Sequence, residues 1–203
     1  MRSSALITVA LSGAAIAGYV SYRAWPPPPA TDAPMADTAA EAPQTAATLP
    51  EFSLMTLEGE QRSIHSWPDR ALVINFWATW CAPCLREIPL LKGFQDAHAQ
   101  DRVQVIGIAV DRVEPVRSFA ADLEFNYPTL IGEADAIEAA ASFGIDFFAL
   151  PFTVFTDAER NVLGVHTGEL EARDLDELAR ILAGRDDGSM DLATARARLA
   201  GQR

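Results

Sequence analysis

Apolar and polar positions divide residues 49–185 into short strands and helices. Two nearly continuous apolar runs, residues 71–77 (ALVINFW) and 103–110 (VQVIGIAV), have the length and pattern of strands buried on both faces. Shorter apolar stretches predict a hairpin around Glu58-Gly59-Glu60, one extended piece, and a second hairpin around the polar turn 157–161. These stretches are residues 52–54 and 62–64, residues 127–131, and residues 152–155 and 162–165.

Helical spacing fills the intervals between these runs. A helix is predicted from about Ala82, where Leu85, Ile88 and Leu91 recur every three residues and Pro89 predicts a kink. Further helices are expected over residues 113–123, 134–143 and 175–182, and a short one over 190–199. Strands that first alternate with helices and then pair as a hairpin predict an α/β fold. Its mixed parallel and antiparallel sheet would have helices on both faces.

The N-terminal segment predicts export. Residues 5–20 carry no charge, and Tyr19, Tyr22 and Trp25 are placed like an interfacial aromatic belt, so residues 1–25 read as a membrane anchor. Ala15-Ile16-Ala17 also has the form of a signal-peptide cleavage site, which keeps the cleaved alternative open. Both readings carry the rest of the chain across a membrane.

The following residues, 26–48, are rich in Pro, Ala and Thr and poor in large apolar side chains, which indicates a linker rather than a core. The expected organisation is therefore an anchor or signal peptide over 1–25, a linker over 26–48, one domain over 49–185 and a tail over 186–203.

The chain is acidic, with a net charge of −12 over 203 residues. Residues 49–185 hold 22 acidic and eleven basic residues, so the predicted domain carries most of this charge. A surface of this sign repels phosphate, and a nucleic-acid partner is not expected. We interpret the charge as solvation of the domain.

The only two cysteines, Cys81 and Cys84, are separated by two residues at the predicted start of a helix. Unpaired backbone N–H groups and the helix dipole favour a thiolate on Cys81, which makes it the attacking group. Cys84, one turn further in, is placed to attack the resulting mixed disulfide. Pro83 suits the first turn, where its missing N–H removes no helical hydrogen bond.

Other uses of two cysteines fit this sequence less well. A zinc site requires about four ligands, but His65, His98 and His166 are far apart along the chain. A structural disulfide over so short a loop would add little stability, and c-type haem attachment requires His where Leu85 stands. Redox chemistry without a metal or other cofactor is the preferred hypothesis.

The string WATWCAPCLREIP, with the strand LVINF before it and Leu150-Pro151-Phe-Thr-Val-Phe-Thr-Asp157 after it, resembles the TlpA/ResA group of bacteria. These are membrane-anchored, thioredoxin-like thiol-disulfide oxidoreductases, and the resemblance covers about residues 49–184. It implies a thioredoxin fold with an N-terminal hairpin extension. It also implies a nucleophile at Cys81, a resolving group at Cys84, and a cis proline at Pro151 that packs against the disulfide.

Two positions beside this motif bear on proton transfer. Asn75 stands where the strand of plain thioredoxins carries a buried, proton-accepting Asp, and an amide cannot accept that proton. Glu87 lies on the same helix face as Cys84, so a partly buried carboxylate there could take the proton of Cys84. The alternative is a solvated Glu87 paired with Arg86 or a nearby Arg.

Residues near the dithiol are candidate substrate contacts. Trp80 is expected to be exposed beside Cys81, whereas Trp77 is expected in the core. Leu150 and Phe152 flank Pro151, where a substrate peptide could add as a strand. Phe147 and Phe148 depart from the small and β-branched residues usual in the family, and they are either an apolar wall near Cys81 or core residues.

These features predict a thiol-disulfide oxidoreductase held in the periplasm, or outside the cytoplasmic membrane, by an anchor in the bacterial inner membrane. The resemblance implies a reductase that receives electrons from a membrane thiol donor. Its implied substrates are exported proteins with disulfides, such as apocytochrome c or oxidase assembly factors.

Two alternatives stay open at this point. A peroxiredoxin shares the fold but requires Thr-x-x-Cys, whereas Thr79 stands two residues before Cys81. A copper-binding assembly chaperone would use Cys81, Cys84 and a distant His such as His166, although such proteins have a wider cysteine spacing.

Overall fold

The computed structural model describes residues 45–145 and 149–201. The predicted anchor and most of the predicted linker lie outside the described residues, as do Phe147 and Phe148. Within the described part of the chain, no helix is both long enough and apolar enough to cross a membrane.

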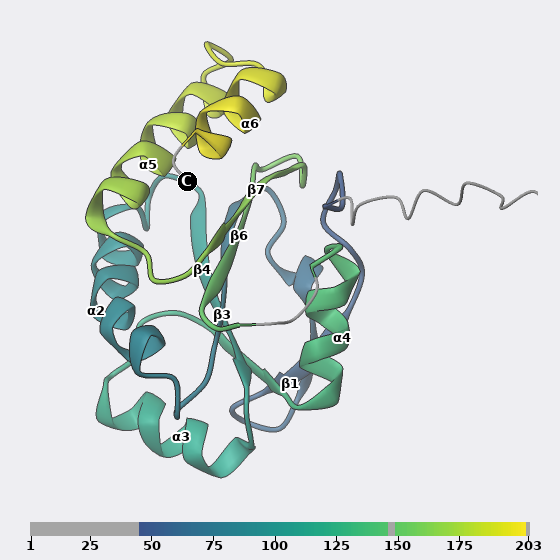
Figure 1. The fold of residues 1–203 in the computed structure, drawn as a ribbon, viewed down its shortest axis with the longest axis vertical. Coiled ribbons are helices and arrows are strands. Elements are labelled where there is room, and N and C mark those ends of the chain that lie inside the picture. Colours follow the sequence, from purple (N-terminus) through teal and green to yellow (C-terminus); the bar gives the residue numbers. More distant parts are fainter. Residues whose placement is uncertain (1–44, 146–148, 202–203) are drawn as a thin grey trace, which may run out of the picture. The chain divides into compact units, whose positions relative to one another are not determined.

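The described residues form a seven-stranded mixed sheet with helices on both faces (Figure 1). Its strand order is β2-β1-β5-β4-β3-β6-β7. The strands are β1 (Ser53–Thr56), β2 (Gln61–Ser63), β3 (Ala71–Trp77), β4 (Val103–Val110), β5 (Thr129–Gly132), β6 (Phe152–Thr156) and β7 (Val162–Thr167). The helices are the 3-10 turn η1 (Ile64–Ser66), α2 (Ala82–Ala97), α3 (Val113–Asp122), α4 (Ala134–Ser142), α5 (Ala172–Asp186) and α6 (Leu192–Ala200).

The pairing of the strands confirms the predicted mixture of directions. Strands β3, β4 and β5 are parallel to one another, whereas β6 runs antiparallel to β3 and β7 antiparallel to β6. The hairpin β1–β2 adds to the other side of the sheet through an antiparallel pair with β5. The fold is therefore the thioredoxin-like α/β fold with an N-terminal hairpin.

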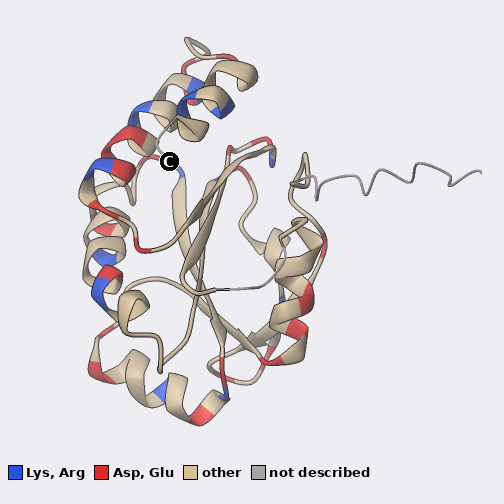
Figure 2. Cartoon of the chain, viewed as in Figure 1, with Lys and Arg blue, Asp and Glu red and all other residues tan. Residues whose placement is uncertain are grey.

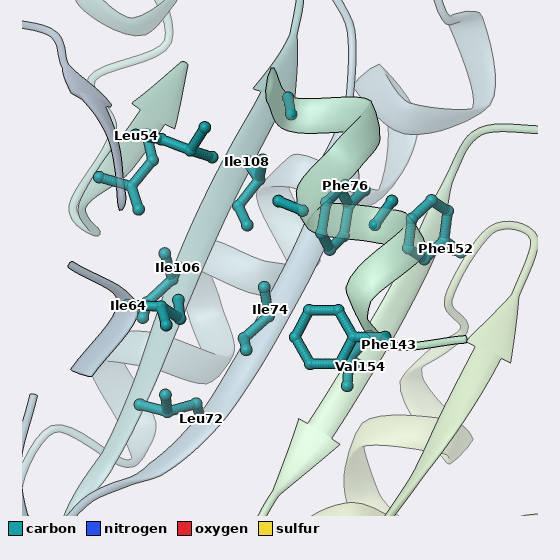
Figure 3. Close-up of a cluster of buried hydrophobic side chains, with 14 of the residues drawn as sticks. Leu54, Ile64, Leu72, Ile74, Phe76, Ile106, Ile108, Phe143, Phe152 and Val154 are labelled. Atoms are coloured by element: carbon teal, nitrogen blue, oxygen red, sulfur yellow. The ribbon is translucent and has the colours of Figure 1, made fainter. Parts of the chain in front are cut away.

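Strand β3 lies in the interior of the sheet, and its apolar sequence suits that position. All seven of its residues are buried, because β4 and β6 pair with its two edges and helices cover both faces. One face contributes Leu72, Ile74 and Phe76 to a core beneath α4 (Figure 3). Phe76 stacks on Phe152 with ring centroids 4.4 Å apart.

The opposite face of the sheet packs against α2, α3 and α5, and it carries the cysteine pair. Charged side chains lie mainly on the helices and connecting turns, while the central strands carry few (Figure 2). Helix α2 continues through Pro89 to Ala97. Helix α5 is longer than predicted because a capping box of Glu171 and Asp174 starts it at Ala172.

Residues 190–199 contain the short helix expected there. Asp191 caps α6 by accepting a hydrogen bond from the N–H of Thr194. Helix α6 packs against β7 and α5, and Arg196 donates hydrogen bonds to the carbonyls of Val162 and Ala47. The C-terminal segment therefore belongs to the same compact unit as the sheet.

Candidate active site

Strand β3 delivers the cysteine pair to the start of α2. The chain leaves β3 at Trp77 and closes a turn in which the N–H of Cys81 donates to the carbonyl of Ala78 at 3.1 Å. Cys81 is the N-cap of α2 and forms a disulfide with Cys84, with the two Cα atoms 5.3 Å apart. The N–H of Cys84 points to Sγ of Cys81 at 3.3 Å, so a backbone donor at the helix N-terminus faces the sulfur.

The two sulfurs differ in their access to solvent. Cys81 is 5% exposed and Cys84 is fully buried, together with Trp77 and Ile88. An incoming group can therefore reach Cys81 but not Cys84. This asymmetry fits the predicted order, in which Cys81 attacks first and Cys84 resolves.

Asp111, directly after β4, holds the turn that carries Cys81. Its Oδ2 accepts hydrogen bonds from the backbone N–H of Thr79 at 3.0 Å and from the Thr79 hydroxyl at 2.5 Å. The N–H of Asp111 donates to the carbonyl of Gly132, which ties the residue to the end of β5. Asp111 is not among the residues that the sequence pattern singles out. Its position in the sequence was the available signal. Asp111 directly follows the buried strand β4, and β4 pairs with β3, the strand that precedes the cysteines.

Asp111→Ala is expected to destabilise the protein by about 1.5 to 3 kcal/mol, the usual worth of hydrogen bonds to a charged group. The same change should slow alkylation of reduced Cys81, because the turn loses its anchor. Denaturant unfolding and iodoacetamide kinetics measure the two effects. Asp111→Asn, which keeps an acceptor oxygen, should restore most of both, and an alanine variant equal to wild type would contradict this role for Asp111.

Glu87 lies one turn beyond Cys84 and is buried, with 1% of its surface exposed. Its Oε1 accepts a hydrogen bond from Nδ2 of Asn75 at 2.7 Å, and its Oε2 accepts one from the N–H of Leu170 at 2.8 Å. Arg86 pairs instead with Glu169 on the surface. The structure therefore excludes the solvated, Arg-paired alternative for Glu87.

Burial raises the pKa of Glu87 to about 7. The hydrogen bonds from Leu170 and Asn75 oppose this rise because they stabilise the carboxylate, and the negative charge of Glu169 adds a little to it. A carboxyl group with this pKa exchanges its proton near neutral pH, as a general acid or base must.

Asn75 connects Glu87 to the sheet. Its amide nitrogen donates to Glu87 and also to the hydroxyl of Thr153 on β6, at 3.0 Å. Asn75 thus fixes the position of the carboxyl group that stands near Cys84. Thr153 and the backbone of Leu170 were not singled out in the sequence, because no local pattern links residues so far apart along the chain.

The peptide bond between Leu150 and Pro151 is cis, as the family resemblance implies. The carbonyl of Pro151 accepts a hydrogen bond from the N–H of Gly168 at 2.9 Å. Gly168 has φ +99°, a conformation that favours glycine, and it opens the segment 168–170 whose last N–H binds Glu87. One short segment therefore contacts both Pro151 and Glu87.

The three predicted substrate contacts, Trp80, Leu150 and Phe152, differ in their exposure to solvent. Trp80 is 69% exposed next to Cys81, whereas Trp77 is buried in the core, both as expected. Leu150 is partly buried and packs against the cluster that contains the two cysteines. The side chain of Phe152 is buried against Phe76, and its main chain lies between β3 and β7, in register with Phe76 and Thr167.

The described residues offer no cluster of metal-binding side chains. In residues 45–145 and 149–201, no three His, Cys, Asp or Glu side chains gather in a way that could hold a metal ion. Nε2 of His166, the ligand considered for copper, lies instead 3.3 Å from the carbonyl oxygen of Glu169.

Sequence comparison identifies the family to which this geometry belongs. The Redoxin family matches residues 44–182. The chain belongs to the Redoxin family. The match includes β3, the cysteine pair, Glu87 and Pro151, which are the residues from which the site is built.

Individual relatives agree with this assignment. The chain is 30% identical to the thioredoxin-like protein YneN of Bacillus subtilis over 132 residues, which is 63% of this chain and 74% of YneN. It is 29% identical to the thiol-disulfide oxidoreductase ResA of Geobacillus thermodenitrificans over 131 residues, covering 63% of this chain and 72% of ResA. The chain is also 30% identical to a thiol:disulfide interchange protein from Chlorobium tepidum whose crystal structure is known. The two structures compare with a TM-score of 0.61, over 67% of this chain and 95% of the Chlorobium chain.

Family membership and the cysteine pair together establish the activity. The protein is a ResA-like thiol-disulfide oxidoreductase whose redox pair is Cys81 and Cys84.

Proposed function

We propose that the protein is a reductase of cysteine pairs in exported proteins, with Cys81 as nucleophile, Cys84 as resolving thiol and Glu87 as proton acceptor. The observation that carries the proposed mechanism is the buried Glu87 carboxyl, one turn beyond Cys84, with a pKa of about 7. A carboxyl group with this pKa can both accept and release a proton near neutral pH. The direction of electron flow is taken from the resemblance to the TlpA/ResA group.

The proposed reaction proceeds in two exchanges. The Cys81 thiolate attacks a substrate disulfide, forms a mixed disulfide and releases one substrate thiolate. Cys84 then gives its proton to Glu87 and attacks Sγ of Cys81. This step releases the second substrate thiolate, which takes its proton from solvent, and leaves the Cys81–Cys84 disulfide. A membrane thiol donor would return two electrons to this disulfide, and solvent would remove the proton from Glu87.

Substrates would bind across the surface beside Cys81. Trp80 offers an exposed aromatic ring, and Leu150 packs against the cluster that contains the two cysteines. Pro151 lacks an N–H and stands at the start of β6, which supports addition of an extended substrate segment there. The resemblance to the TlpA/ResA group favours apocytochrome c or oxidase assembly factors as substrates, and an inner-membrane anchor over residues 1–25 with the domain outside the cytoplasmic membrane.

The reduction potential tests the direction of electron flow. Equilibration of the full-length protein with glutathione buffers, followed by quantification of the Cys81–Cys84 disulfide, should give a value near the roughly −270 mV of thioredoxin. A value near the roughly −120 mV of a strong periplasmic oxidant would overturn the assignment as a reductase.

Glu87→Gln tests the proton acceptor. In wild type, the rate of the resolving step should rise with pH through about 7, because only ionised Glu87 accepts the Cys84 proton. The glutamine variant should lose this inflection and resolve mixed disulfides more slowly, on the order of 10²-fold. Stopped-flow kinetics of the glutathione mixed disulfide at a series of pH values measures both effects. Glu138→Gln, an exposed position on α4, is the matched control.

Stability gives a second readout of the same change. In the folded protein the pKa of Glu87 is about 7, above the usual value of about 4.3 for an unfolded chain. The folded state therefore binds this proton more tightly than the unfolded state, and protonation of Glu87 stabilises the fold. The free energy of unfolding of the oxidised protein should therefore fall as the pH rises from about 4 through 7, and Glu87→Gln should flatten this slope. Identical slopes and rate profiles in wild type and variant would remove Glu87 from the mechanism.

A further inference from the structure

The segment from Gly168 to Leu170 belongs to the connection between β7 and α5 and lies beside α2 (Figure 1). Gly168 donates its N–H to the carbonyl of Pro151, and Leu170 donates its N–H to Oε2 of Glu87. The side chain of Leu170 is buried in the core under α5. Glu169, between them, carries a partly exposed carboxylate at the surface.

Arg86 of α2 binds this carboxylate through one edge of its guanidinium group. Its Nε lies 3.1 Å from Oε1 and 3.0 Å from Oε2 of Glu169, and its Nη2 also donates to Oε2. The two side chains are 59% and 33% exposed. An isolated exposed ion pair contributes little to stability, but a bidentate pair of this kind fixes how its two partners are oriented.

Consecutive residues of α2 thus bind consecutive residues of the segment. Arg86 binds the side chain of Glu169 at the surface, and Glu87 binds the N–H of Leu170 in the interior. In both contacts the partners are 83 residues apart along the chain, so local structure does not hold them together. Movement of the segment away from α2 would therefore weaken the surface pair and the buried hydrogen bond together.

The hydrogen bond from Leu170 acts on the proton affinity of Glu87. Burial raises the pKa of Glu87 to about 7, and the bond from Leu170 opposes this rise. The negative charge of Glu169 raises the same pKa, and Arg86 places a positive charge against it. Loss of the ion pair would thus raise the pKa of Glu87 further, because the carboxylate loses a donor and faces an unpaired negative charge.

Other groups face Glu87 from the sheet and from its own helix. Asn75 of β3 donates to Oε1, and the phenol of Tyr127, just before β5, has a pKa raised by burial and by the charge of Glu87. The two cysteines form a disulfide and carry no thiol proton in the oxidised protein. Among these groups, Glu169 and its partner Arg86 are the charged pair at the surface.

We propose that the Arg86–Glu169 ion pair is a latch that holds residues 168–170 against α2, and that both residues position the proton acceptor Glu87. The latch keeps the N–H of Leu170 on Oε2 of Glu87, so the carboxyl group keeps its place one turn beyond the resolving cysteine. Arg86 and Glu169 take no part in the exchange itself and are positioning residues. This role rests on the proposed function of Glu87, whereas the latch itself does not.

Amide hydrogen exchange at Leu170 tests the latch. In the full-length oxidised protein, Arg86→Gln and Glu169→Gln should each speed exchange of this amide by about two- to fivefold relative to the core amide of Ile106, the scale expected for an exposed ion pair. Arg180→Gln is the matched control, because it removes the same group from an exposed ion pair within α5. Exchange followed by NMR measures all four proteins.

Titration of the Glu87 carboxyl by carbon NMR tests the positioning role. The midpoint should rise by roughly 0.3 to 0.7 pH units in Arg86→Gln and stay unchanged in Arg180→Gln. The pH inflection of the resolving step should move upward by the same amount, because in the proposed mechanism only the ionised carboxyl accepts the Cys84 proton. Glu169→Gln is left out of this measurement, since it also removes a charge that acts on Glu87.

The outcomes separate the latch, the positioning role and the proposed function. Unchanged exchange at Leu170 in either Arg86→Gln or Glu169→Gln would overturn the latch. Faster exchange with an unchanged Glu87 midpoint would overturn the positioning role. If exchange and midpoint both change but Glu87→Gln leaves the kinetics as in wild type, the latch stands and the assignment of Glu87 as proton acceptor falls.

Discussion

Cys81→Ser is expected to abolish thiol-disulfide exchange, with a loss on the order of 10⁴-fold or more, the usual scale for removal of a covalent nucleophile. The reason is structural as well as chemical. Cys81 is the N-cap of α2 and the more accessible of the two sulfurs, while Cys84 is fully buried and cannot reach a substrate in its place. Turnover of oxidised glutathione by the reduced protein measures the loss.

Cys84→Ser provides the matched control, because it removes the same atom type one turn further into the helix. This variant should still react with oxidised glutathione at Cys81 but should stop at the mixed disulfide, which mass spectrometry detects as one added glutathionyl group. Accumulation of the adduct on the Cys81→Ser variant instead would reverse the assigned order of attack.

The largest effect on stability is expected from Phe76→Ala. Phe76 has no exposed surface, stacks on Phe152 and meets the edge of the Phe143 ring at 6.3 Å between centroids (Figure 3). Its removal leaves a cavity in a core that cannot fully collapse, and the free energy of unfolding should drop by about 3 to 5 kcal/mol. Urea unfolding of the oxidised protein measures the change.

Ile137→Ala, at an exposed apolar position on α4, should change the same free energy by about 0.5 kcal/mol or less. Phe76 points to the sheet face opposite the cysteines, since its neighbours Asn75 and Trp77 point to the cysteine side. Folded Phe76→Ala protein should therefore keep normal Cys81 reactivity. A loss of less than about 1 kcal/mol would contradict the assignment of Phe76 to the centre of this core.

The site combines a local device with a long-range one. The local device is the helix start, where the N–H of Cys84 faces the sulfur of Cys81 and favours the thiolate. The long-range device is the support of Glu87, whose two oxygens are bonded by Asn75 from β3 and by Leu170 from the segment before α5. The first lowers the barrier to attack, and in the proposed mechanism the second receives the proton that resolution releases.

Much of the architecture could be predicted from the sequence because its determinants are local. The continuous apolar runs predicted β3 and β4, the turn residues predicted both hairpins, and the helix beginning at Ala82 was confirmed. Cysteines three positions apart on a helix start must lie close together whatever the rest of the chain does, so the redox pair was readable as well. The first and last residues of the helices were harder to predict. Helix α5 starts before the apolar pattern does, because Glu171 and Asp174 cap it.

The environment of Glu87 was decided by the tertiary structure. The sequence placed Glu87 on the face of Cys84 but left it either solvated or buried, since one helix alone cannot tell what covers it. The partners that settle the question stand 12 and 83 residues away, at Asn75 and Leu170. Asp111 likewise acquires its role only through strand register, which brings it to Thr79 and to the end of β5. Hydrogen bonds between distant segments depend on how the strands pair and how the helices pack on them. A local pattern of residues does not show which distant segments come into contact.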